Sequence, residues 1–138
     1  MTQRNIHGMF SMSFEKRILH SKVTGSTNKE LSQAWYEDMK KHILSSSNKN
    51  TLPWVVLIDS RNWEMASQDI EEITNETINW AREHGCCLFC TVTSKKIQQF
   101  ALNKEFGHQS IVTMSSDYDE AYQACLNKLS EAQNQHSK

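Results

Sequence analysis

The chain has 138 residues, a net charge of -1, 38% hydrophobic residues and 22% charged residues. This length suits one domain with a sizeable core, and the composition is typical of a soluble globular protein rather than a disordered one. Basic residues occur in runs of no more than two, so the sequence lacks the positive stripe through which proteins contact nucleic acid. We therefore expect no nucleic-acid partner.

Membrane and targeting signals are also missing from the pattern. No apolar run approaches the ~20 residues that a membrane-spanning helix needs, and the first residues lack the apolar stretch of a signal peptide. We therefore expect no membrane span and a cytoplasmic location. With one proline and four glycines, long linkers are not expected. We predict a single domain over residues 8–130, with flexible termini at 1–7 and 131–138.

The N-terminal part of the chain predicts a β-hairpin followed by a helix. Phe10, Met12 and Phe14 alternate with serines, which is the period-2 pattern of a strand. A second strand is expected over residues 18–24, after a turn at 15–17. Thr27, with Glu30 three residues later, forms a capping box that begins a helix over residues 28–44. The exposed part of the hairpin is also a candidate surface for a homodimer.

The remaining chain predicts three successive strand–helix units. Residues 54–58 form an unbroken apolar run, which suits a central strand that is buried on both faces. Two further strands are expected over residues 86–92 and 110–114. The helices that follow the three strands are expected from Ser67 to Gly85, from Ser94 to Gly107 and from Ser116 to Leu129. The order β-β-α-β-α-β-α-β-α predicts an α/β fold with a mixed five-stranded sheet and four helices.

One rim of this predicted sheet is the candidate site. The carboxyl ends of parallel strands meet there, and the helices that follow point unpaired N–H groups toward it. We expect residues 59–66 to form the longest loop on this rim, with Asp59, Arg61 and Trp63 protruding from it. Trp63 either packs under its own loop or anchors a partner, and an Asp59–Arg61 pair that only holds the loop explains the charges equally well. The candidate ligand-binding or partner-binding residues are Asp59, Arg61, Trp63, Ser67, Thr93, Ser94 and Ser116.

Cysteines and histidines do not form a competing site. Cys86, Cys87 and Cys90 lie in an apolar run and are expected to be buried free thiols. On a regular strand Cys86 and Cys90 share a face about 13 Å apart and Cys87 points the other way, which does not fit a zinc ion. His84 is expected at the opposite end of the sheet from Asp59 and Ser67. We therefore predict no metal, no cofactor and no catalytic residue.

The pattern resembles the STAS family, the fold of bacterial anti-sigma-factor antagonists and of the cytoplasmic domains of sulfate transporters. The resemblance rests on Val23-Thr-Gly-Ser-Thr-Asn28, the helix that follows, and Val55-Val-Leu-Ile-Asp59, and it extends from about Phe10 to Leu129. Asp59-Ser-Arg61-Asn-Trp63 is similar to an Asp-x-Arg-x-Trp segment in small SpoIIAA-like bacterial proteins. The resemblance implies that Ser67 matches a serine that a partner kinase phosphorylates, although Ala66-Ser67-Gln68-Asp69 lacks the glycine and the preceding acid of the family pattern.

Three functions are consistent with these observations. The first is a non-catalytic STAS-like regulatory module that binds a protein partner or a small ligand at the Asp59–Ser67 rim. The second is an anti-sigma-factor antagonist that is switched by phosphorylation of Ser67. The third is a small enzyme of unknown reaction, which ranks last because no base and nucleophile are expected on the same edge of the sheet.

Overall fold

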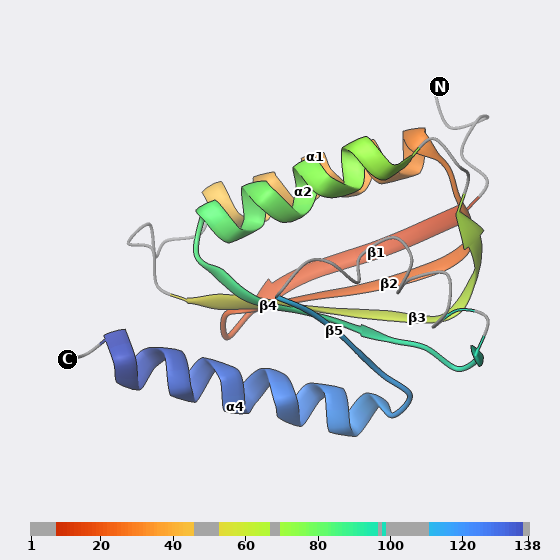
Figure 1. Ribbon diagram of the computed structural model, residues 1–138. Coiled ribbons are helices and arrows are strands. Elements are labelled where there is room, and N and C mark those ends of the chain that lie inside the picture. The colour runs from red at the N-terminus through yellow and green to blue at the C-terminus, as the bar shows by residue number, and fades with distance from the viewer. Residues whose placement is uncertain (1–7, 46–52, 67–69, 97, 99–110, 137–138) are drawn as a thin grey trace.

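A computed structural model describes residues 8–45, 53–66, 70–96, 98 and 111–136 of the chain. Five strands form one sheet, and helices lie on both of its faces (Figure 1). The elements in chain order are β1 (Gly8–Glu15), β2 (Ile18–Thr27), α1 (Lys29–Leu44), β3 (Trp54–Ala66), α2 (Glu71–Glu83), β4 (Cys86–Val92), β5 (Val112–Ser115) and α4 (Tyr118–His136).

The sheet is mixed, as the sequence predicts. Its strands stand in the order β1-β2-β3-β4-β5. The β1–β2 hairpin is antiparallel, and every later pair of neighbours is parallel. The hairpin turns at Lys16 and Arg17, which both have positive φ angles of 53° and 66°, the conformation of a two-residue turn that matches the twist of the strands. The predicted α/β class and the antiparallel leading hairpin are therefore confirmed.

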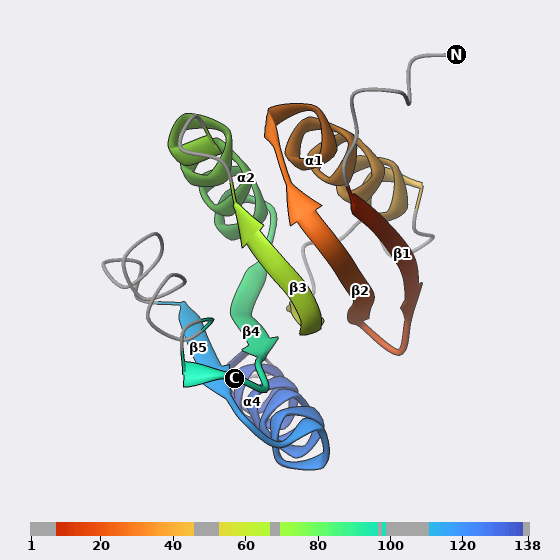
Figure 2. The same ribbon diagram turned by 90° about the vertical axis from the view of Figure 1, so that its right-hand side faces the viewer.

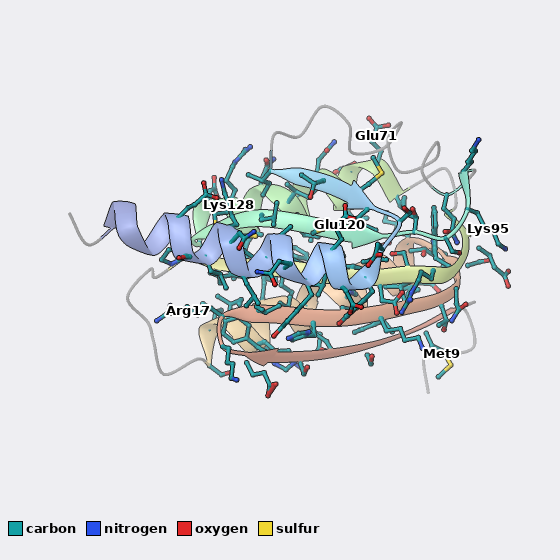
Figure 3. The ribbon with its side chains drawn as sticks, turned by 90° about the horizontal axis from the view of Figure 1, so that it is seen from below. Met9, Arg17, Glu71, Lys95, Glu120 and Lys128 are labelled. Carbon is teal, nitrogen blue, oxygen red and sulfur yellow. The ribbon has the colours of Figure 1, made fainter. Side chains whose placement is uncertain are left out.

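Helices cover the two faces of the sheet unequally. In Figures 1 and 2, α1 and α2 lie side by side on one face, and α4 lies on the other. Along β3, Trp54 and Val56 pack into the core under α1 and α2, whereas Val55 and Leu57 pack into the core under α4, which explains why this stretch is apolar without alternation. α4 packs mainly against β3, β4 and β5, and it also reaches β2, because Ile18 belongs to the same core and the His20 ring lies 6.3 Å from that of Tyr122. Figure 3 shows α4 lying across this face of the sheet.

The helix that the sequence predicts after Ser94 lies mostly outside the described residues. Lys96 and Gln98 are helical, but residues 97 and 99–110 are not described. The described part of the chain holds three complete helices where the sequence predicts four in the whole chain. None of these helices is both long and apolar enough to span a membrane.

Three helix starts differ from the sequence prediction. Asn28 rather than Thr27 caps α1, because its side chain accepts a hydrogen bond of 2.9 Å from the N–H of Leu31. Ile70 is at the N-cap of α2 and makes no side-chain capping bond; Ser67, the predicted start of this helix, lies outside the described residues. At the start of α4, Asp117 accepts a bond of 3.0 Å from the N–H of Glu120, which is the capping role predicted for Ser116.

The cysteine arrangement on β4 corrects another expectation. All four cysteines are free, and Cys86 and Cys90 are buried as predicted. However, Cys86 belongs to the core under α1 and α2, whereas Cys87 and Cys90 face the core under α4. An irregularity in the pairing of β3 with β4 sets Trp54 against Cys86 and Val55 against Leu88. This β-bulge inserts Cys87 as an extra residue and reverses the face that Cys86 occupies.

Candidate functional site

The second half of β3 builds the candidate site. The sequence predicts that the strand ends at Ile58 and gives way to a loop, but β3 continues to Ala66. β2 is also longer than predicted and pairs with β3 as far as Thr27 opposite Ala66. β4, by contrast, pairs with β3 no further than Val92 opposite Asp59. Asp59, Arg61 and Trp63 are therefore strand residues at the carboxyl rim of the sheet, and the predicted loop is wrong.

Trp63 is not displayed to solvent. Its side chain is 6% exposed, and the indole N–H donates a hydrogen bond of 2.7 Å to the hydroxyl oxygen of Thr27. This contact ties the second half of β3 to the last residue of β2. Of the two roles expected for Trp63, the structure shows the buried one, because the ring is withdrawn from solvent and its N–H already has a partner on β2.

A buried glutamine fixes the same segment from the other side. The side chain of Gln98, which is 1% exposed, donates from Nε2 to the carbonyl oxygens of Trp63 at 2.7 Å and Arg61 at 3.2 Å. Its Oε1 accepts from the N–H groups of Ser94 at 2.8 Å and Lys95 at 3.2 Å. The hydroxyl of Ser94 adds a bond of 3.0 Å to the carbonyl of Arg61. Backbone groups that have no β4 partner are satisfied in this way.

Asp59 and Arg61 form a bidentate ion pair. Arg61 donates from Nη2 to Oδ2 of Asp59 at 2.8 Å and from Nε to Oδ1 at 2.9 Å, and its backbone N–H also reaches Oδ1 at 3.1 Å. These hydrogen bonds lower the pKa of Asp59, against the opposing effect of burial, and the same bonds raise the pKa of Arg61. The Asp59 side chain is 13% exposed, whereas that of Arg61 is 45% exposed.

The Arg61 guanidinium also reaches α4. Its Cζ atom lies 5.4 Å from the centre of the Tyr118 ring, within the range of a cation–π contact. The charge of Lys22 on β2 further lowers the pKa of Asp59, and Asp117 adds to the rise in the pKa of Arg61. We call these five residues, Lys22, Asp59, Arg61, Asp117 and Tyr118, the Arg61 surface. It combines two cations, two carboxylates and one half-buried aromatic ring from β2, β3 and the start of α4.

The other predicted site residues divide into three kinds. Thr93 is fully buried, and its Oγ1 has no hydrogen-bond partner, so its side chain is not part of the surface. Ser94 and Ser116 are exposed, and Ser94 is engaged with the backbone of β3 as described above. Ser67 lies outside the described residues. Among the predicted residues, the structure thus joins the side chains of Asp59 and Arg61 as an ion pair and places the Ser94 hydroxyl on the backbone of Arg61.

The alternative metal or catalytic centres gain no support within the described residues. No group of three or more His, Cys, Asp and Glu side chains there could hold a metal ion. His84 stacks on Trp80 with ring centres 3.8 Å apart, and its carbonyl accepts from the indole of Trp54 at the start of β3. His84 therefore lies at the end of the sheet opposite Asp59, as the sequence predicts.

Sequence reasoning missed Gln98, Lys22 and the contact made by Tyr118. Lys22 falls in the strand predicted over residues 18–24, and Tyr118 falls in the helix predicted from Ser116 to Leu129. The predicted topology already puts the start of the Tyr118 helix at the Asp59 rim, whereas the position of Lys22 opposite Asp59 follows from the β2–β3 register that the structure shows. No local sequence signal marks Gln98 as a buried side chain that hydrogen-bonds the backbone of β3.

Comparison with solved structures supports the fold. No protein-family model matches the sequence, and no curated protein matches it. Solved structures do match, although their sequence identity to this chain is low. An uncharacterized Shewanella loihica protein of the DUF3478 family, described as having a SpoIIAA-like fold, matches with a TM-score of 0.60 and 14% identity over 86% of this chain and 94% of its own.

Two anti-sigma factor antagonists are also similar to this chain. One from Mycobacterium paratuberculosis has a TM-score of 0.62 and 13% identity over 86% of this chain and 94% of its own. The other, SpoIIAA in its unphosphorylated form, has a TM-score of 0.54 and 7% identity over 86% of this chain and 98% of its own. The chain therefore has a SpoIIAA-like fold, as the resemblance in the sequence implies.

Proposed function

We propose that this chain is a cytoplasmic, non-catalytic regulatory module that binds a protein partner through the Arg61 surface. The observation that carries the proposal is the state of Arg61 itself. Its side chain is 45% exposed, yet its guanidinium is held by two bonds to Asp59 and lies near the Tyr118 ring. An exposed arginine that is already fixed loses little side-chain entropy when a partner binds.

The residue types of this surface favour a protein partner over a small anion. Arginine and tyrosine are enriched among the residues that contribute most to protein–protein binding. The carboxylates of Asp59 and Asp117 stand beside Arg61 and repel a free phosphate or carboxylate ligand. Nη1 of Arg61 has no acceptor among the described residues and is available to donate to a partner's carbonyl or carboxylate oxygen. The fold adds support, because two of its solved neighbours are described as anti-sigma factor antagonists.

Capture of partners from an extract of the host tests this proposal. Tagged wild-type protein, Arg61→Ala and Arg82→Ala are compared by quantitative mass spectrometry. Arg82 is the matched control because it is an exposed arginine at the far end of α2, with one hydrogen bond of 2.8 Å to Asn79. We expect at least one protein to be retained by the wild type and by Arg82→Ala and to be lost about tenfold or more from Arg61→Ala.

A companion variant separates charge from geometry. Arg61→Lys keeps the positive charge but cannot form the two-bonded pair with Asp59, so we expect it to lose most of the same partner. Circular dichroism and thermal unfolding of each variant show that the fold is intact. Equal capture by wild type and Arg61→Ala, with both folded, would contradict the assignment of the Arg61 surface as the binding site.

The second candidate is a phospho-switch at Ser67. The description of SpoIIAA in its unphosphorylated form favours it, and Ser67 follows the same strand that carries Arg61. A phosphate there would add about two negative charges within a short stretch of chain from Arg61 and would alter partner binding. Mass spectrometry of the protein isolated from its host across growth conditions tests this idea. The absence of phosphate on the peptide containing Ser67 under all of them would count against it.

A further inference from the structure

The two edges of the sheet differ in length and in regularity. β5, at one edge, has four residues, whereas β1, at the other, has eight. All eight β1 residues pair with β2 without a bulge. Figure 2 shows β1 at the outside of the sheet, and no described element pairs with its free side. β1 is thus a long, regular edge strand.

This edge lacks the features that usually keep edge strands from pairing. Such strands are commonly interrupted by proline, bulges or lysine. From Gly8 to Phe14 the strand contains no charged residue and no proline, and its only charge is Glu15 at the end. Among the large hydrophobic residues that the structure describes, Met9 has the largest exposed fraction, at 73%. The sequence of β1 therefore favours a further strand beside it.

The free side of β1 offers backbone groups from three apolar residues. The hydroxyl of Ser21 on β2 donates to the carbonyl of Ser11 at 2.7 Å, so the backbone groups of Ser11 face β2. Because these directions alternate along an antiparallel strand, the N–H and C=O groups of Phe10, Met12 and Phe14 face outward. The side chains of these three residues pack against the core under α1 and α2 but are only partly buried.

We propose that β1 pairs antiparallel with β1 of a second copy, with the two-fold axis at Met12. Antiparallel pairing by a two-fold axis places residues of equal parity opposite each other, because opposed side chains share a face. With the axis at Met12, Phe10 lies opposite Phe14 of the second copy, and Ser11 lies opposite Ser13 of the second copy. The apolar layer then continues across the dimer, and the two Glu15 carboxylates stand at opposite ends.

The neighbouring register fits less well. An axis at Ser11 would set Phe14 opposite Gly8 of the second copy and would leave the aromatic ring without a side chain to pack against. The Met12 register instead forms two cross-strand aromatic pairs, which are among the more stabilising pairs in sheets. The Met12 axis also places the aliphatic part of Glu15 beside the exposed Met9 side chain of the second copy. Self-complementarity of this kind favours a second copy as the occupant of the edge.

Two double variants at exposed positions test both the edge and the register. Ser11→Glu with Ser13→Glu sets like charges directly opposite each other across the proposed dimer. Ser11→Glu with Ser13→Lys sets opposite charges there, with the same number of substitutions. Within each chain Ser11 stands opposite Lys22 and Ser13 opposite His20, so the new carboxylate at position 11 has a favourable neighbour in both variants.

Sedimentation velocity over micromolar to submillimolar concentrations gives the readout, with thermal unfolding as the check on the fold. We expect the wild type and the Glu/Lys variant to reach twice the 16.0 kDa mass of one chain. The Glu/Glu variant should raise the dimer dissociation constant by about tenfold or more. A wild type that stays monomeric overturns the proposal. If both variants dimerise as well as the wild type, the interface does not lie at β1. If both lose dimerisation equally, the Met12 register is excluded.

Discussion

The first half of β3, residues 54–58, lies between β2 and β4. Its residues 54–57 are at most 3% exposed, and Ile58 is partly buried. In the second half, residues 59–66, β4 pairs no further than Asp59, and from Ser60 onward β2 is the only strand neighbour among the described residues. Besides the pairing with β2, this half is held by the indole bond of Trp63 to Thr27 and by hydrogen bonds from the side chains of Gln98 and Ser94. The same strand is thus stabilised by apolar burial at one end and by polar side chains at the other.

This difference bears on function. A segment held by apolar burial is as stable as the whole domain, whereas a segment held by a few polar contacts can open locally. The Arg61 surface is built on the second half of β3, so its geometry depends on side chains from β2 and from the segment after β4. Partner binding at this surface and the local stability of the second half are therefore expected to be linked.

The largest expected effect comes from the first half. Leu57→Ala removes a side chain that is 1% exposed and should lower the free energy of unfolding by about 2–5 kcal/mol. Urea denaturation measures the change. The matched control is Asn62→Ala at an exposed position of the second half, where we expect a change within about 0.5 kcal/mol. A loss at Leu57 no greater than the control would remove the contrast between the halves.

The next effect concerns the buried side chain of Gln98. Gln98→Ala deletes four hydrogen bonds and leaves the buried carbonyl of Trp63 without its partner, which should cost about 1–3 kcal/mol. Hydrogen exchange should quicken at residues 61–66 more than at residues 54–58. Gln123→Ala, which removes an exposed amide bonded to Asn127 at 3.2 Å, is the control and should leave both halves unchanged. Equal quickening of both halves would show that Gln98 acts on the whole domain rather than on this segment.

A smaller effect is expected at the indole bond. Trp63→Phe keeps most of the apolar packing but removes the N–H that donates to Thr27, so unfolding should become easier by about 1 kcal/mol. Thr27→Val removes the acceptor instead. If this one bond accounts for the loss of stability in each single variant, the free energy of unfolding of the double variant should fall by clearly less than the sum of the two single losses. Strict additivity in urea denaturation would mean that the contact contributes nothing of its own.

The smallest expected effect is the dependence on pH at the ion pair. Hydrogen bonds from Arg61 lower the pKa of Asp59 below its ordinary value of 3.8. A carboxyl with a lowered pKa in the folded state stabilises the fold above its unfolded pKa and loses this contribution as pH falls through the folded pKa. The stability difference between wild type and Asp59→Asn should therefore be constant near neutral pH and shrink as pH drops below 3.8. If the free energies of unfolding of wild type and Asp59→Asn differed by the same amount at neutral pH and well below pH 3.8, the Asp59–Arg61 pairing would be contradicted.

The sequence predicts one half of β3 and not the other for a physical reason. Residues 54–58 are themselves apolar, so the composition of this run is enough to identify it as a buried strand. In the second half, the register with β2 moves from Lys22–Asp59 to Thr24–Asn62 and from Gly25–Trp63 to Thr27–Ala66. Each step places an extra β3 residue against β2, which removes the period-2 alternation that marks a strand. The partners that hold the segment lie more than 30 residues away in the chain.

The candidate site follows the same division. The carboxyl rim, the mixed sheet and the Asp59–Arg61 pair could be predicted, because each follows from element order and local spacing. The burial of Trp63 and the role of Gln98 could not, because both depend on contacts between distant segments. The bulge at Cys87 is a further case, since one inserted residue changes the face of Cys86 without any mark in the local sequence.

Hydrogen exchange of wild-type β3, resolved by residue and measured with and without the captured partner, tests the account most directly. We predict that residues 54–58 exchange only through global unfolding, whereas residues 61–66 are protected but exchange through a local opening that the partner suppresses. Exchange of residues 61–66 at the rate of an unstructured chain would contradict the extended strand. Unchanged protection of these residues in the complex would contradict binding at the Arg61 surface.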